Sequence, residues 1–407
     1  MRRFVGLLNM LKISQRANKV IASPVRKFLP LMLAAEKRGV KVFKLNVGNP
    51  DIAPPPLLLK TIKNYQPLSL DYAPSPGIRE HVAAWVLYYK KLKINLKSEN
   101  IIPTVGGAEA ILLSVMAVTD PGDELIVFEP FYASYKGFAA MAGFKLVPVT
   151  LRVDNDFALP AAAEIEKKIT RKTKAIIVIN PNNPTGTVWG KKESQIIIDI
   201  ANKNNLFVIS DETYREIVFE QKPSSILNLP AAKNCAIVVD SASKRFSCPG
   251  ARIGCIASFN NEIMAAVLKF AMIRLSAPTL EQYGLIPLLK NSTNYTEKIT
   301  AEYKKRRDAV FNALQKMPGV ICQKPQGAFY IIAKLPVDNA ENFVKFMLME
   351  FSYNKKTVIV TPAENFYMTP GLGRNEIRIA YVLSVKELKE AMEVLRKGLE
   401  KYKAKKQ

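Results

Sequence analysis

The chain has 407 residues, and its 59 Lys and Arg outnumber its 35 Asp and Glu to give a formal net charge of +24. This length suggests about two domains. With one histidine, His81, the sequence cannot provide both a Ser/His/Asp triad and a separate histidine metal site, so we expect no metal site and place His81 on a helix surface.

The basic residues are spread along the chain, and only residues 401–406 form a dense cluster. Because the sequence shows no aromatic-rich RNA motif, zinc finger or evident helix-turn-helix, we expect no specific nucleic-acid partner. A generally basic proteome, or a surface that attracts anionic metabolites, explains the charge more economically. The four cysteines lack CxxC spacing and do not suggest a disulfide framework, which favours a reducing cytoplasm.

The N-terminus is unusual because residues 1–35 contain seven Lys or Arg and no acidic residue. Such a composition resembles a mitochondrial presequence. No apolar run in the chain approaches membrane-spanning length, so we expect no transmembrane helix and no membrane partner.

A glycine turn, TVGGAEA at residues 104–110, opens an apolar helical run. The free backbone N–H groups and the positive end of a helix at such a turn suit a phosphate. Gly107, Ala108 and Glu109 are therefore candidate phosphate-binding residues. The same turn taken alone is an ordinary loop.

Three short apolar runs follow, and each leads into a polar cluster. They span residues 174–179, 206–209 and 236–239. Continuous β-branched runs of this length indicate strands buried on both faces, hence parallel strands of an α/β sheet. Since ligands bind beyond the carboxyl ends of such strands, we expect Asn183, Asp211 and Lys244 to converge at one edge.

The stretch SASKRFSCPGARIG at residues 241–254 places Lys244 between hydroxyls and a fixed cation. A lysine amine can form a Schiff base with an aldehyde. Ser241, Ser243 and Arg252 can supply hydrogen bonds and charge to a phosphate. The combination predicts pyridoxal 5'-phosphate (PLP) as the cofactor, whereas the stretch in isolation is a polar loop.

Asp211, Asn183 and Tyr214 have separate chemical reasons to lie near this cofactor. A buried carboxylate beside the pyridine nitrogen keeps that nitrogen protonated, which suits Asp211. The phenolate oxygen of the ring needs neutral donors, which Asn183 and the Tyr214 hydroxyl can provide. The alternative for Asp211 is a helix N-cap.

The C-terminal third carries three further signals. A long polar helix is expected from about Asn294 to Leu314. Arg378 lies in a strand-like run of Ile and Val, where a cation is disfavoured unless it meets an anion. Ser384 and Glu387 have the spacing of a capping box at the start of the last helix.

Taken together, and in this order, these motifs resemble the fold-type I PLP enzymes, specifically the class I/II aminotransferases that include aspartate aminotransferase. The resemblance runs from about Arg16 to about Tyr402. It implies that Gly48, in the segment LNVGNPD, borders the substrate carboxylate, and that Arg378 with Asn183 clamps that carboxylate.

The resemblance also implies roles for three tyrosines. Tyr72, followed by Gly77, resembles the tyrosine that reaches across a homodimer to the phosphate of the neighbouring subunit. Tyr132 falls where the family stacks a ring on the pyridine face, although a core aromatic is the alternative. For Tyr135 we prefer the core.

The fold implied is α/β, the PLP-dependent transferase fold (fold type I). A large PLP-binding domain at residues 54–290 has a mostly parallel sheet sandwiched by helices. A smaller α+β domain combines residues 1–53, including an N-terminal lid segment, with residues 291–407. Because the resemblance to the lid begins near Arg16, too few residues precede it for a convincing transit peptide, and we expect a cytoplasmic protein.

The function implied is a PLP-dependent aminotransferase that moves an amino group between an L-amino acid and a 2-oxo acid by a ping-pong mechanism, with Lys244, Asp211 and Tyr214 as its catalytic residues. Aspartate and 2-oxoglutarate are the leading pair, with Arg274 or Arg26 as candidate partners of a distal carboxylate. Alternatives are an alanine or aromatic aminotransferase and a PLP-dependent C–S β-lyase. A PLP-binding regulator is disfavoured because only about 40 residues precede Gly48, too few for a DNA-binding domain.

Overall fold

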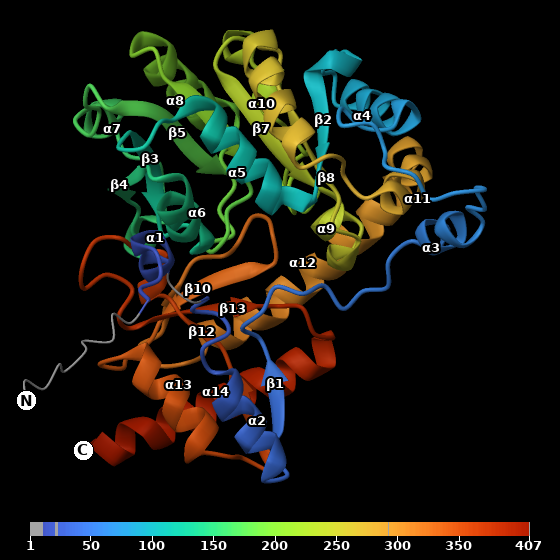
Figure 1. Cartoon of the computed structure of the whole chain (residues 1–407). Helices are drawn as coiled ribbons and strands as arrows, with labels where there is room; N and C mark the ends of the chain where they lie inside the picture. Colours follow the sequence, from blue (N-terminus) through green and yellow to red (C-terminus); the bar gives the residue numbers. More distant parts are fainter. Residues whose placement is uncertain (1–10, 21–22, 292, 407) are drawn as a thin grey trace, which may run out of the picture.

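The structure is a computed structural model that describes residues 11–20, 23–291 and 293–406. A seven-stranded sheet lies in the upper part of the molecule as drawn in Figure 1. Its strand order is β2-β8-β7-β6-β5-β3-β4. The strand β8 runs antiparallel to both of its neighbours, and the remaining neighbouring pairs are parallel. The strands are β2 (Ile101–Thr104), β3 (Glu124–Glu129), β4 (Lys145–Thr150), β5 (Thr173–Ile179), β6 (Phe207–Asp211), β7 (Ala236–Ser241) and β8 (Gly254–Ala257).

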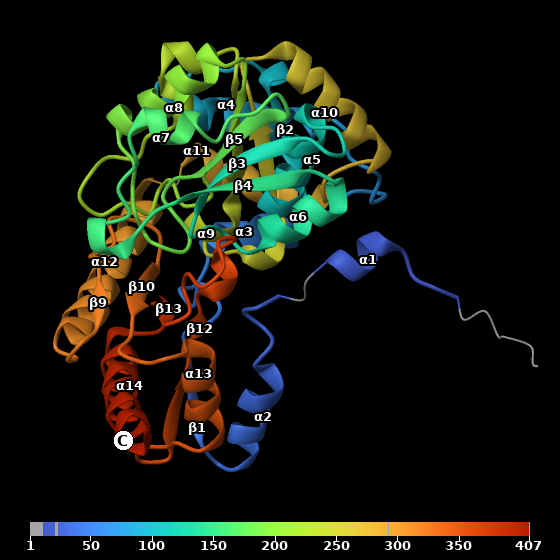
Figure 2. The ribbon, with the colours of Figure 1, turned by 90° about the vertical axis from the view of Figure 1, so that its left-hand side faces the viewer.

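The three apolar runs of the sequence form β5, β6 and β7, which lie side by side and parallel, as predicted. Alternate side chains of these strands enter two different cores: Ile176 and Val178 on one face, Ile177 and Ile179 on the other. Helices cover both faces, which confirms the predicted sandwich (Figures 1 and 2). On the first face pack α4 (Arg79–Lys91), α8 (Lys191–Lys203) and α11 (Thr279–Lys290), and on the second α5 (Gly106–Val118), α6 (Ser134–Ala142) and α10 (Asn261–Ile273).

The lower part of Figure 1 combines both ends of the chain. An antiparallel sheet in the order β12-β13-β10-β9 lies there, and β1 pairs in parallel with β11. The strands are β1 (Lys41–Lys44), β9 (Ile321–Cys322), β10 (Tyr330–Lys334), β11 (Lys356–Ile359), β12 (Thr361–Pro362) and β13 (Glu376–Ala380). The helices are α2 (Leu29–Lys37), α13 (Ala340–Met349) and α14 (Val385–Lys406). The domain boundaries at residues 54 and 290 stay predictions.

The long polar helix is present as α12 (Thr293–Gln315), which runs from the upper part to the lower part (Figure 1). The predicted cap of α14 is also present: Ser384 Oγ accepts from the Glu387 N–H at 3.3 Å and donates to the Glu387 carboxylate at 2.8 Å. Shorter helices are α1 (Gln15–Lys19), α3 (Pro56–Lys63), α7 (Ala162–Glu166) and α9 (Ala242–Arg245).

The surface position predicted for His81 is wrong. His81 has an exposed fraction of 0% and accepts a hydrogen bond at 3.1 Å from the indole N–H of Trp85, one turn further along α4. Burial lowers the pKa of His81 to about 3. The error arises because residues four apart share a helix face, so His81 follows the aromatic side of α4 into the core.

The four cysteines, Cys235, Cys248, Cys255 and Cys322, are buried and free. Within the described ranges, no helix combines the length and the apolar character that a membrane crossing requires. Groups of His, Cys, Asp or Glu able to hold a metal ion are likewise absent from those ranges.

Candidate active site

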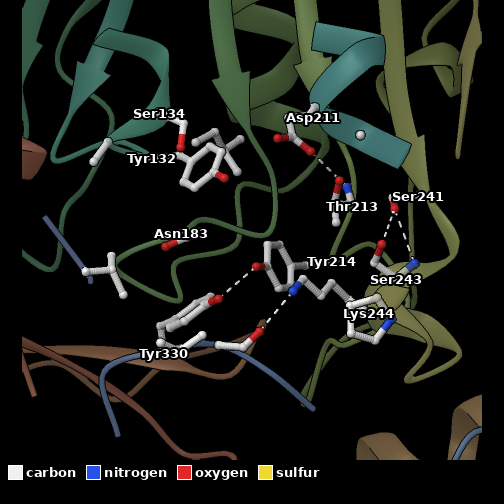
Figure 3. Close-up of a pocket in the computed structure, with 18 of the residues that line it drawn as sticks. Tyr132, Ser134, Asn183, Asp211, Thr213, Tyr214, Ser241, Ser243, Lys244 and Tyr330 are labelled. Carbon is white, nitrogen blue, oxygen red and sulfur yellow. Dashed lines mark hydrogen bonds between the residues drawn. The ribbon is translucent and has the colours of Figure 1, made fainter. Parts of the chain in front are cut away.

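A cavity of about 510 Å³ opens at the carboxyl ends of β5, β6 and β7. The upper part of the molecule contributes Asn183, Asp211 and Lys244 to its wall, and the lower part contributes Tyr330 (Figure 3). Arg378, also from the lower part, lines the same cavity. The structure therefore brings together the residues that the strand pattern placed at one edge of the sheet.

Lys244 lies in the short helix α9, directly after β7, and is half-buried. Its Nζ donates to the carbonyl oxygen of Gly48 at 2.9 Å (Figure 3). Burial lowers the pKa of Lys244 to about 8, and the positive charges of Arg378 and Arg252 act in the same direction. An amine with this pKa is partly unprotonated near neutral pH, as a nucleophile or base requires.

Gly48, whose carbonyl oxygen accepts from Lys244, has its backbone packed against the side chain of Tyr330. A Cβ atom at position 48 would come within 1.8 Å of the Tyr330 hydroxyl oxygen. Tyr330 in turn exchanges a hydrogen bond of 3.0 Å with the hydroxyl of Tyr214, on the same wall of the cavity (Figure 3).

Asp211 ends β6 and has an exposed fraction of 6%. Its carboxylate accepts from the backbone N–H of Thr213 at 3.1 Å and from the hydroxyl of Tyr135 at 3.4 Å. Burial raises the pKa of Asp211 to about 6, so a cation placed against it would favour the charged form. A turn rather than a helix follows Asp211, which removes the N-cap alternative. Tyr135 is buried, in agreement with its assignment to the core.

Hydroxyls, a guanidinium group and a helix start meet beside Lys244. Ser241 Oγ donates to Ser243 Oγ at 2.9 Å and accepts from the Ser243 N–H at 3.2 Å. The helix α5 begins at Gly106, where a Cβ atom would lie 2.6 Å from Nη2 of Arg252. A Cβ atom at Gly107 would lie 3.3 Å from Thr213 Oγ1. Such a set of donors suits a phosphate group.

Arg378, in β13, is 3% exposed, and among the described residues the acidic groups near it are tyrosines rather than carboxylates. Its Nη1 donates to Asn183 Oδ1 at 3.0 Å and its Nη2 to the carbonyl oxygen of Asn46 at 2.6 Å. Its Nε is buried without a partner. Burial lowers the pKa of Arg378. A buried cation with a free donor is suited to an incoming carboxylate.

Tyr132 and Ala108 also line the cavity, whereas three other expected residues do not reach it. The carboxylate of Glu109 accepts from the Val105 N–H at 2.8 Å and lies 3.5 Å from Nε of Arg274. Tyr72 has an exposed fraction of 81% and lines a separate hollow. The residues outside the cavity wall are thus Glu109, Arg274 and Tyr72, while Arg26 lies on the wall.

The sequence reasoning missed Tyr330, Thr213 and Phe366 as parts of this wall. Tyr330 falls within residues 291–407 of the predicted smaller domain, in the segment PQGAFY at residues 325–330. No pattern marks Tyr330, because its position depends on a pairing of β10 with β13 that brings it beside Gly48.

Comparison with known proteins identifies the family. A model of class I and II aminotransferases matches residues 40–395. The chain belongs to this family. Its members are PLP-dependent enzymes that act on amino acids and 2-oxo acids. The predicted recognition, fold class, enzyme class and cofactor are therefore confirmed.

Three relatives illustrate the range of the family. An aspartate aminotransferase of Pyrococcus horikoshii is 32% identical over 369 residues, 88% of this chain and 91% of the relative. An aromatic-amino-acid aminotransferase of Thermococcus litoralis is 31% identical, with 96% and 99% coverage. The solved alanine aminotransferase of Pyrococcus furiosus superposes with a TM-score of 0.88 at 31% identity, covering 96% of this chain and all of its own.

The donor set of the cavity fits PLP. The cavity offers a lysine with a lowered pKa, a buried carboxylate, and hydroxyl and guanidinium donors beside the start of α5. These groups match an aldehyde, a ring nitrogen and a phosphate, respectively. Gly106 has a φ of +72°, the left-handed conformation that favours glycine, and it starts α5, whose first backbone N–H groups have no helical partner and suit an anion.

Proposed function

We propose that this aminotransferase transfers the amino group of L-aspartate to 2-oxoglutarate by a ping-pong mechanism. The observation that carries the chemistry is the convergence of Lys244, Asp211 and Arg378 on one cavity. When bound, PLP supplies an electron sink for the carbanion that develops at the substrate α-carbon.

Lys244 holds the cofactor and, once free, moves the proton at the α-carbon. Its pKa near 8 supports this role, since a base close to the operating pH can both accept and return a proton. Asp211 holds the ring nitrogen in its protonated form, and its burial makes the pairing with a cation favourable. Asn183 and the Tyr214 hydroxyl are the neutral donors to the ring oxygen.

The phosphate is held by Ser241, Ser243, Arg252 and the start of α5 at Gly107, Ala108 and Glu109. For Glu109 we assign the backbone N–H alone, because its side chain is turned to Val105. Tyr132 stacks on the ring. These assignments rest on positions in the cavity wall, except that of Glu109, which rests on its place in the first turn of α5.

The substrate α-carboxylate binds Arg378, with Asn183 and the backbone of Gly48 beside it. Asn183 already orients the guanidinium group through its 3.0 Å hydrogen bond, which reduces the entropy lost when the substrate binds. A carboxylate held in this way fixes the direction of the α-C–H bond for proton transfer to Lys244.

The preference for aspartate is supported by Arg26, an exposed cation that lines the cavity and can meet a distal carboxylate. Arg274 is not a candidate within one chain, because it is turned to Pro103 and Glu109. An alanine or aromatic donor is the second candidate, since the same wall also carries Val25 and Phe366. The β-lyase and regulator alternatives are not favoured by the enzyme class of the family.

A panel of amino donors with 2-oxoglutarate as the acceptor tests the substrate. We expect aspartate to give the highest kcat/KM, and Arg26→Gln to reduce it for aspartate but not for alanine. Lys27→Gln is the matched control, because Lys27 pairs with Glu341 and does not line the cavity. A higher kcat/KM for an aromatic donor, unaffected by Arg26→Gln, would replace aspartate by the second candidate.

We further propose a homodimer in which Tyr72 reaches the phosphate of the neighbouring subunit. Tyr72, Leu68 and Leu70 are strongly exposed, which is unusual for apolar and aromatic side chains in a monomer. A two-fold interface would bury these side chains. Sedimentation of the active enzyme tests this proposal: an active monomer at assay concentration would contradict it. A cytoplasmic location stays a prediction.

A further inference from the structure

Four buried charged side chains form a cluster directly behind the cavity. We call Glu212, Arg215, Asp240 and Arg245 the charge cluster. Each has an exposed fraction of 1% or less. Two carboxylates and two guanidinium groups make the cluster formally neutral. None of the four lines the cavity itself, and the proposed reaction uses none of them.

Asp240 is the centre of the cluster. Its carboxylate pairs with both Arg215 and Arg245, and it accepts from the Tyr89 hydroxyl at 3.1 Å. The same carboxylate accepts from the backbone N–H of Ser241 at 2.7 Å. The buried side chain of Asp240 is thus bonded to two arginines and to Ser241, the first residue of the stretch at residues 241–254 that contains Lys244.

Glu212 is the second carboxylate of the cluster. It pairs with Arg215 and accepts from the Ser225 hydroxyl at 2.9 Å and from the backbone N–H of Ile226 at 2.8 Å. Both carboxylate oxygens of Glu212 therefore have partners. Arg215 links Glu212, the residue directly after β6, to Asp240 within β7.

The position of the cluster in the chain sets it apart from other buried ion pairs. Glu212 directly follows Asp211, and Arg245 directly follows Lys244. Each of these two cavity residues is therefore the chain neighbour of a residue whose side chain is held by ion pairs in the charge cluster. Buried charges in such a network have few alternative arrangements, because losing a partner leaves an uncompensated charge in the interior.

We infer that the charge cluster positions two cavity residues. The linked ion pairs Arg245–Asp240–Arg215–Glu212 hold the backbone at Lys244 in a fixed position relative to the backbone at Asp211. The members of the charge cluster are positioning residues that act through their neighbours. This inference rests on the proposed function, since it takes Lys244 and Asp211 as the two ends of the cofactor site.

The test compares two buried arginines in the full-length protein. Arg245→Met breaks the cluster, and Arg307→Met is the matched control. Arg307 is also 1% exposed and ion-paired, but its partners are Glu220 and Asp308, which do not line the cavity. Two quantities are measured for each variant: the Kd of PLP for the stripped protein, and the visible circular dichroism per bound PLP.

For Arg245→Met we expect the Kd to rise about tenfold or more and the dichroic band to fall by about half, because the cofactor is held less rigidly. For Arg307→Met we expect a lower Tm, with both cofactor quantities within about twofold of the wild type. Wild-type Kd and dichroism in folded Arg245→Met would overturn the inference.

A milder variant decides the matter if Arg245→Met does not fold. Tyr89→Phe removes the hydroxyl that donates to Asp240 and leaves the ion pairs in place. We expect a Kd increase of about two- to fivefold and a smaller dichroic band, as for the loss of one hydrogen bond. Unchanged values in Tyr89→Phe would then overturn the inference. Finding the reduced cofactor on a lysine other than Lys244 in the wild type would instead defeat the proposed function.

Discussion

Replacing Arg378 by methionine should abolish recognition of the substrate α-carboxylate. The guanidinium group is buried, its Nε has no partner, and its other two nitrogens are already oriented by Asn183 and the carbonyl of Asn46. A hydrogen bond to a charged group contributes about 1.5–3 kcal/mol, and each 1.4 kcal/mol corresponds to about a factor of ten. We therefore expect kcat/KM to fall about 10- to 100-fold for each such bond that Arg378→Met removes.

The assay compares two donors. One is the best amino acid in the donor panel, and the other is the primary amine that lacks its α-carboxylate. Because Arg378 acts on the carboxylate, Arg378→Met should penalise the amino acid and spare the amine. Equal losses for both donors would refute the reasoning, since they would mean that Arg378 supports the fold of the cavity rather than the substrate.

Three further predictions concern Asp211, Arg252 and Gly48. Asp211→Asn should reduce turnover even at saturating PLP. Because burial raises the pKa of Asp211 in the folded protein from 3.8 to about 6, ionisation of this carboxyl lowers the free energy of unfolding as the pH rises through this window. Asp211→Asn should therefore also raise the Tm of the cofactor-free protein at pH 7 but not at pH 4. A lower Tm at pH 7 would contradict this sign. Arg252→Ala should weaken PLP binding by about 1.5–3 kcal/mol, measured as a Kd; an unchanged Kd would remove Arg252 from the phosphate site. Gly48→Ala should displace Tyr330 and lower kcat, because the added Cβ atom would lie 1.8 Å from the Tyr330 hydroxyl oxygen. Wild-type kinetics in this variant would show that Tyr330 can move without affecting the reaction.

The large sheet and the main residues of the cavity were predictable because their signals are local. Continuous β-branched runs specify buried parallel strands, and the carboxyl ends of parallel strands meet at one edge. Asn183, Asp211 and Lys244 each follow such a run, so their convergence followed from the strand pattern. Arg378 was predictable for another reason, since a cation in an apolar strand needs an anion.

The features that sequence reasoning missed depend on tertiary contacts. The burial of His81 depends on which face of α4 turns to the sheet, and a single histidine carries no signal of that. The Tyr214–Tyr330 contact joins the turn that follows β6 to the first residue of β10, which lies more than 100 residues further along the chain. The charge cluster is hidden in the sequence because a buried Arg245 and a surface arginine look alike until their partners are known.

The measurement that tests the central claim most directly is the identity of the lysine that carries the cofactor. Purified enzyme is reduced with borohydride, digested and analysed by mass spectrometry. We expect the reduced PLP adduct on Lys244, and Lys244→Ala should still bind PLP noncovalently while losing transamination by several orders of magnitude. An adduct on another lysine, or an active Lys244→Ala, would contradict the assignment of this cavity as the active site.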